Sequence, residues 1–138
     1  MSKLDSFWNS LNWLIRKNAR HNLSFRSLLS LSKSIEELFN KYRLKQDNNF
    51  ENVFKNIGQI RIDATEISYL SGQAIEISRQ IEGKDLSPLA TELHNSLEDL
   101  KRSLFTRTLS KEVLTQRISQ VDMAFHNFLI AISDIQYK

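Results

Sequence analysis

The feature that most constrains this chain is a line of apolar and small residues that repeats without a break between Phe50 and Ile81. Residues spaced alternately by three and four positions fall on one face of an α-helix, and over many turns they form the a and d positions of a packed helix. We therefore predict one long helix over residues 50–81 with one buried face. We name this line the inner seam; it consists of Phe50, Val53, Ile57, Ile60, Ala64, Ile67, Ser71, Ala74, Ser78 and Ile81.

A second line lies on the opposite side of the same predicted helix and has the same spacing. Glycine inside a helix costs roughly 0.5–1 kcal/mol relative to alanine, so two glycines on one line suggest the close approach of another backbone. That backbone belongs either to another helix of this chain or to a second protein. We predict this line as a protein interface and name it the outer stripe; it consists of Gly58, Ile62, Thr65, Tyr69 and Gly72.

Four further segments carry the spacing of a packed helix. Leucines repeat it over residues 86–104, a mixed apolar line repeats it over residues 114–135, and two further lines mark helical segments over residues 4–15 and 24–45. Polar turn signals separate these segments. Among them, Ser87 before Pro88, and Ser110 further along, are typical of residues that cap the start of a helix.

These segments predict an all-α fold: an antiparallel up-and-down bundle of four long helices with coiled-coil-like packing, formed by one domain over residues 1–138. Short connections make successive helices antiparallel neighbours. The first helix is either continuous or split near His21, because no glycine or proline forces a break there. A split gives a bundle of five helices.

The composition excludes several classes of protein. Only three glycines and one proline occur, which argues against a turn-rich β fold, and the absence of cysteine excludes disulfides, thiolate zinc sites and iron–sulfur clusters. No apolar run reaches the roughly 18 residues needed to span a bilayer. The polar residues near the N-terminus do not fit a signal peptide. We predict a cytoplasmic protein with no membrane partner.

The first third of the chain concentrates positive charge. Residues 1–46 hold nine Lys or Arg against three Asp or Glu, and the basic residues after Trp13 lie on its side of the predicted first helix. Cationic groups beside an aromatic ring can hold a phosphate backbone and stack a base, although a plain solvated face has the same pattern. We predict a site for RNA, DNA or an acidic partner at Trp13, Arg16, Lys17, Arg20, His21 and Arg26.

The segment from Arg16 to His21 has an arginine-x4-histidine spacing. This spacing resembles the motif of HEPN-type ribonucleases, which are small all-helical dimers. The resemblance covers six residues. Lys17 stands where that family usually has Asn, Asp or His, and the motif lies here on the first helix and not late in the chain. The resemblance implies a ribonuclease with His21 in its active site.

No other catalytic pattern occurs. The sequence has no glycine-rich phosphate loop, no nucleophile elbow and no His-Glu-x-x-His zinc motif, and it predicts no metal site or cofactor. We expect a non-enzymatic interaction module that self-associates, or binds another protein, and acts as an adaptor or accessory subunit. The alternatives are a nucleic-acid-binding accessory protein that uses the basic N-terminal face and, third, a HEPN-like ribonuclease.

Overall fold

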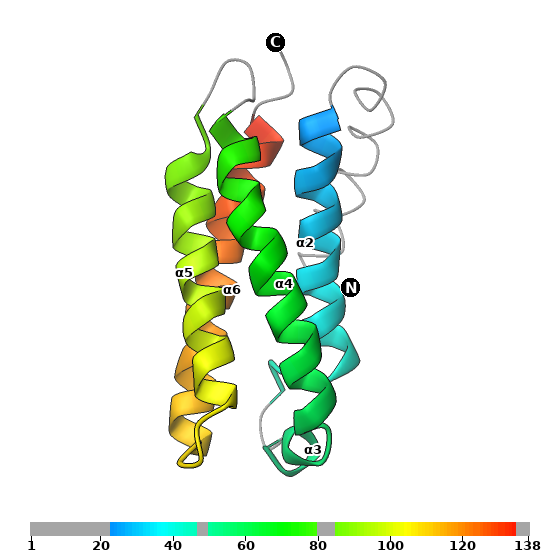
Figure 1. The fold of residues 1–138 in the computed structure, drawn as a ribbon, viewed down its shortest axis with the longest axis vertical. Helices are drawn as coiled ribbons and strands as arrows, with labels where there is room; N and C mark the ends of the chain where they lie inside the picture. Colours follow the sequence, from blue (N-terminus) through cyan, green and yellow to red (C-terminus); the bar gives the residue numbers. More distant parts are fainter. Residues whose placement is uncertain (1–22, 47–49, 80–84, 135–138) are drawn as a thin grey trace.

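The computed structural model describes residues 23–46, 50–79 and 85–134, and these residues form helices and no strand. Figure 1 shows the long helices side by side, with successive long helices running in opposite directions. The predicted all-α bundle is confirmed. Whether the first 45 residues form one helix or two depends on residues 1–22, which lie outside the described residues. The helices are α2 (Leu23–Lys41), α3 (Phe50–Lys55), α4 (Ile57–Arg79), α5 (Ser87–Leu104) and α6 (Lys111–Asp134).

The predicted seams form the core of the bundle. Helix α4 packs against both α2 and α5, and α5 packs against α6. The inner seam is buried from Val53 to Ser78 apart from Ile57, which is partly buried like Phe50; Ile81 lies outside the described residues. The largest fully buried side chains are Phe125, Phe128, Leu28, Ile35, Ile60, Leu86, Leu93, Leu97, Leu100 and Leu104.

The predicted single helix over residues 50–81 is interrupted at Asn56, which separates α3 from α4. The backbone amide of Asn56 bonds to two carbonyls, those of Asn52 (3.3 Å) and Val53 (3.1 Å), and its side-chain amide donates to the Asn52 carbonyl (2.9 Å). Asparagine competes with the helical backbone in this way, and nearby Gly58 lowers helix propensity further. The helical hydrogen-bonding pattern then resumes with the bond from the Ile60 amide to the Asn56 carbonyl (2.9 Å).

Helix α2 ends without glycine. Arg43 adopts a left-handed conformation (φ 51°), the Arg43 amide bonds to the Asn40 carbonyl, and the Leu44 amide bonds to the Phe39 carbonyl. This pair of bonds is a Schellman motif, in which the residue after the left-handed position makes an apolar contact. Leu44 is buried, and it fixes the direction in which the chain leaves α2.

Of the two predicted helix caps, Ser110 is confirmed and Ser87 is wrong. Ser110 caps α6, because its Oγ accepts a hydrogen bond from the Val113 amide (3.1 Å). Ser87, in contrast, is the first residue of α5, and Leu86 occupies the capping position without a side-chain bond. The Asp85 carboxylate takes the capping role, since it accepts a bond from the Ser87 amide (2.9 Å). An acidic group next to free helix amides is favoured by the helix dipole.

None of the helices among the described residues is both long and apolar enough to cross a membrane.

Candidate protein–protein interface

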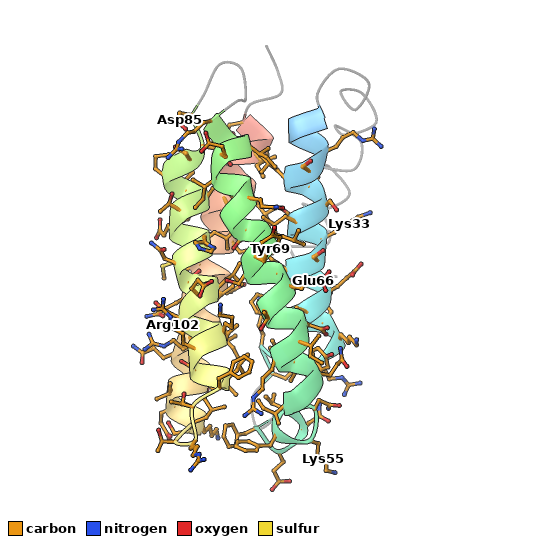
Figure 2. The ribbon with its side chains drawn as sticks, viewed as in Figure 1. Lys33, Lys55, Glu66, Tyr69, Asp85 and Arg102 are labelled. Atoms are coloured by element: carbon orange, nitrogen blue, oxygen red, sulfur yellow. The ribbon has the colours of Figure 1, made fainter. Side chains whose placement is uncertain are left out.

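The outer stripe of α4 is largely exposed. Ile62 and Tyr69 keep 61% and 67% of their surface accessible, and Thr65 is exposed between them. Gly58 is exposed as well, and a Cβ atom built on it would meet nothing within 4 Å. No described helix of this chain therefore covers the stripe at these four residues. Figure 2 shows Tyr69 and Glu66 on this side of α4.

Phe105, just after the end of α5, extends the exposed apolar area. Phe105 is 59% accessible, and the Arg61 guanidinium carbon lies 5.4 Å from the centroid of its ring. The Arg61 Nε also donates to the Leu104 carbonyl (2.7 Å), so one side chain ties the end of α5 to α4. A shallow hollow of about 440 Å³ lies here, lined by Gly58, Arg61, Ile62, Thr65, Glu66 and Phe105.

These observations define one exposed area, which we name the α4 surface. It consists of Gly58, Arg61, Ile62, Thr65, Tyr69 and Phe105. The helical spacing predicts the members on α4 except Arg61, which lies one position off the outer stripe. Phe105 follows the last position of the leucine line, so its large ring cannot continue that line. A large aromatic residue directly after the leucine line is the sequence signal for an exposed ring, but the sequence does not show which neighbour the ring meets.

Gly72, the fifth residue of the outer stripe, faces a different neighbour. A Cβ atom built on Gly72 would lie 3.3 Å from Cε1 of His94 on α5. The missing side chain therefore makes room for an imidazole of the same chain. Gly72 is half-buried, and it belongs to the packing of α4 against α5 and not to the α4 surface.

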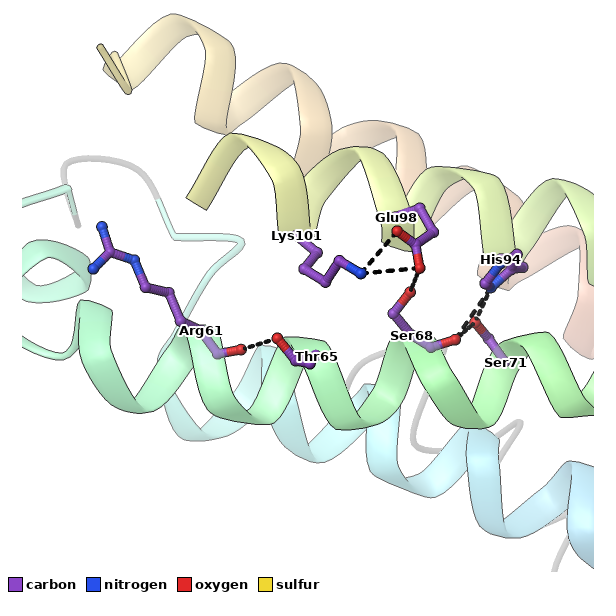
Figure 3. Close-up of polar contacts among 7 residues, drawn as sticks. All are labelled: Arg61, Thr65, Ser68, Ser71, His94, Glu98 and Lys101. Atoms are coloured by element: carbon purple, nitrogen blue, oxygen red, sulfur yellow. Dashed lines mark hydrogen bonds and ion pairs between the residues drawn. The ribbon is translucent and has the colours of Figure 1, made fainter. Parts of the chain in front are cut away.

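His94 is held by two acceptors on α4, as Figure 3 shows. Its Nδ1 lies 2.8 Å from Ser71 Oγ and 3.1 Å from the Ser68 carbonyl oxygen. A carbonyl can only accept, so this geometry places a proton on Nδ1. Ser71 Oγ in turn donates to the same carbonyl (2.7 Å) and is 1% accessible. In this arrangement Nδ1 cannot take the proton of Ser71, and the contacts hold α4 and α5 together.

The same interface contains a second polar cluster one turn away. The Glu98 carboxylate accepts a hydrogen bond from Ser68 Oγ (2.8 Å) and pairs with Lys101 Nζ (2.9 Å). The bond from Lys101, followed by that from Ser68, lowers the pKa of the Glu98 carboxyl below its ordinary value of 4.5. The charged carboxylate therefore crosslinks α4 and α5 at neutral pH.

On its other side, α4 is attached to α2 through Asp63. Tyr42 Oη donates to Asp63 Oδ2 (2.6 Å), Gln59 Nε2 donates to Oδ1 (3.0 Å), and Lys41 Nζ lies 3.8 Å away. Burial alone raises the pKa of the Asp63 carboxyl, but these hydrogen bonds and the charge of Lys41 outweigh it, and the pKa lies below 3.8. Polar contacts thus hold α4 from both sides, and its outer face remains accessible.

The basic N-terminal face stays a prediction. Five of its residues, Trp13, Arg16, Lys17, Arg20 and His21, lie outside the described residues, and the predicted ribonuclease motif lies there too. The sixth, Arg26, is exposed on α2. Within residues 23–46, 50–79 and 85–134, no three His, Asp or Glu side chains are grouped as metal ligands would be.

Comparisons of this chain with family models, with curated proteins and with solved structures find no match.

Proposed function

We propose that this chain is a non-enzymatic helical-bundle interaction module that self-associates through the α4 surface and acts as an adaptor or accessory subunit. The observation that carries the proposal is the exposure of Ile62 and Phe105, which line one hollow, and of Tyr69 two turns further along α4, a helix already packed on two sides. Single exposed apolar residues are ordinary, whereas adjoining ones mark interaction sites.

The residue types also fit an interface. Tyrosine, phenylalanine and arginine are enriched at protein interfaces, and tyrosine and arginine are frequent among the residues that dominate binding energy. Arg61 is partly preorganised by its bond to the Leu104 carbonyl, so little side-chain entropy remains to be lost when a partner covers it. Gly58 lets a partner approach the α4 backbone closely.

Light scattering coupled to gel filtration tests the proposal. The wild-type chain is expected to run as a dimer or larger assembly, and the double substitution Ile62→Ser with Tyr69→Ser is expected to give a monomer with an unchanged helical spectrum. Met123→Ser on α6 is the matched control, because Met123 is also a large exposed apolar side chain (65% accessible) but lies away from α4. A wild-type chain that stays monomeric at high micromolar concentration would end the self-association proposal.

The basic residues of the first third favour the alternative function, binding of nucleic acid. Here Arg16→Glu with Lys17→Glu is expected to abolish salt-dependent retention of RNA or DNA, because removing the cations that neutralise phosphates lowers both the affinity and its salt dependence. An absence of retention at low salt would exclude this alternative. Ribonuclease activity that persists in His21→Ala would exclude the HEPN-like mechanism.

A further inference from the structure

An exposed charge lies near each end of α4, and the two charges are opposite in sign. Lys55, the last residue of α3, lies two residues before α4 begins, and Glu76 lies three residues before α4 ends. Both side chains are exposed. Glu76 pairs with Arg79 on its own helix, whereas Lys55 has no ion pair with any described residue. In Figure 2, Lys55 lies at the lower end of the molecule and Tyr69 lies well above it on α4.

We propose that the partner of the α4 surface is a second copy of this chain, whose α4 lies antiparallel to the first about a two-fold axis next to Thr65. This inference rests on the proposed function and adds the orientation of the two copies. A two-fold axis at Thr65 places Lys55 of each copy opposite Glu76 of the other. A parallel pair would instead place lysine against lysine and glutamate against glutamate, which is unfavourable.

The residues between the charged ends are also complementary in the antiparallel arrangement of the two copies. The axis brings Tyr69 of one copy over the segment from Gly58 to Ile62 of the other. The open backbone at Gly58 leaves room for the tyrosine ring. Arg61 and Phe105 flank this segment, so the incoming ring gains an aromatic and a cationic neighbour. Each copy contributes the same residues, as a two-fold interface requires.

Helix geometry limits how the two copies cross. At 1.5 Å rise per residue, the stretch of α4 from Ile57 to Glu76 spans about 30 Å, so each end of this stretch lies about 15 Å from the axis. Crossing at about 20° offsets the facing ends by only about 5 Å, which long side chains bridge, whereas crossing at about 50° offsets them by about 13 Å. We therefore infer the shallow crossing that is typical of antiparallel bundles.

Single cysteines test the orientation directly, because the chain has none of its own. Thr65→Cys, next to the axis, is expected to form a disulfide-linked dimer under mild oxidation. With a short bis-maleimide, Lys55→Cys alone and Glu76→Cys alone are expected to cross-link poorly, whereas a mixture of the two proteins is expected to cross-link well. If either protein alone cross-links as efficiently as the mixture, the antiparallel arrangement is wrong even though self-association stands.

Charge reversal provides a second test that needs no cross-linker. Lys55→Glu is expected to weaken dimerisation about tenfold at low salt, since it places like charges together at both ends of the pair. Adding Glu76→Lys to the same chain is expected to restore the wild-type affinity. Lys33→Glu on α2 changes the net charge equally and is expected to have little effect. Sedimentation equilibrium measures the dimer dissociation constant of all four proteins. An unchanged dissociation constant in Lys55→Glu would contradict the proposal.

Discussion

The two glycines of α4 look equivalent in the sequence and have opposite environments in the structure. Gly72 lies beneath the His94 ring, which occupies the space where a side chain would be. Gly58 faces open space, and no contact with a described residue explains it. The comparison extends to the two faces of the helix: the inner face is filled by other helices of the chain, and the outer face carries large side chains that no described helix covers. A repeated glycine therefore has to be explained position by position.

Two isoleucines on these opposite faces should show the largest difference. Ile60 is 1% accessible and Ile62 is 61% accessible. Ile60→Ala leaves a cavity in the core and is expected to lower the free energy of unfolding by about 2–5 kcal/mol. Ile62→Ala is expected to change it by no more than about 0.5 kcal/mol. Urea unfolding followed by circular dichroism in dilute solution measures both, and equal losses would mean that the two faces are not distinct.

Leucine at each glycine should separate the two environments next. Gly72→Leu forces His94 away from Ser71 and the Ser68 carbonyl, and we expect it to lower the free energy of unfolding by about 1–3 kcal/mol. At Gly58 the Cβ atom of the same leucine meets nothing within 4 Å, and leucine improves helix propensity. It should therefore leave the stability unchanged or slightly higher. The imidazole resonances of His94 should shift only in the Gly72 variant; a shift in both would contradict the assignment.

Acid should weaken the attachment of α4 to α2. The pKa of Asp63 is lower in the folded chain than its ordinary value of 3.8, so the unfolded chain binds the proton first as the pH falls. The stability that Asp63 contributes is therefore present above pH 4 and lost below it. Asp63→Asn is expected to remove about 1 kcal/mol at neutral pH and to flatten the pH dependence of the thermal midpoint between pH 5 and pH 3. A wild-type slope that survives in Asp63→Asn would show that other carboxyls are responsible.

Alanine at Gly58 is expected to produce the smallest effect. The methyl group would meet nothing within 4 Å, and alanine costs less conformational entropy than glycine in a helix, so the monomer should gain about 0.5 kcal/mol. The proposed dimer should not gain, because the methyl group takes up room that Tyr69 of the other copy uses. Thermal unfolding and sedimentation equilibrium on the same protein compare the two effects. A variant that gains stability and dimerises more tightly would contradict the assigned role of Gly58.

Much of the fold followed from residue spacing, and the exceptions have local causes. The leucine and mixed apolar lines predicted α5 and α6, and the inner seam predicted the buried face of α4. The pattern could not show the interruption at Asn56, because hydrophobic spacing continues across a single turn residue. Nor could it show that Asp85 caps α5 in place of Ser87. Capping depends on where one carboxylate can reach a free amide, and the spacing of apolar residues does not contain that information.

The candidate interface divides in the same way. Spacing alone placed Gly58, Ile62, Thr65 and Tyr69 on one side of a helix, because the period of the helix determines which residues share a face. Whether that face is covered depends on the number and position of neighbouring helices, and only the tertiary structure decided this. In the tertiary structure, Gly72 packs against His94, and Phe105 lies next to Arg61 at the edge of the stripe. The other four residues of the outer stripe are exposed. The spacing of residues along the sequence determines on which face of the helix each side chain lies. Packing between segments far apart in the sequence determines which neighbour, if any, contacts that face.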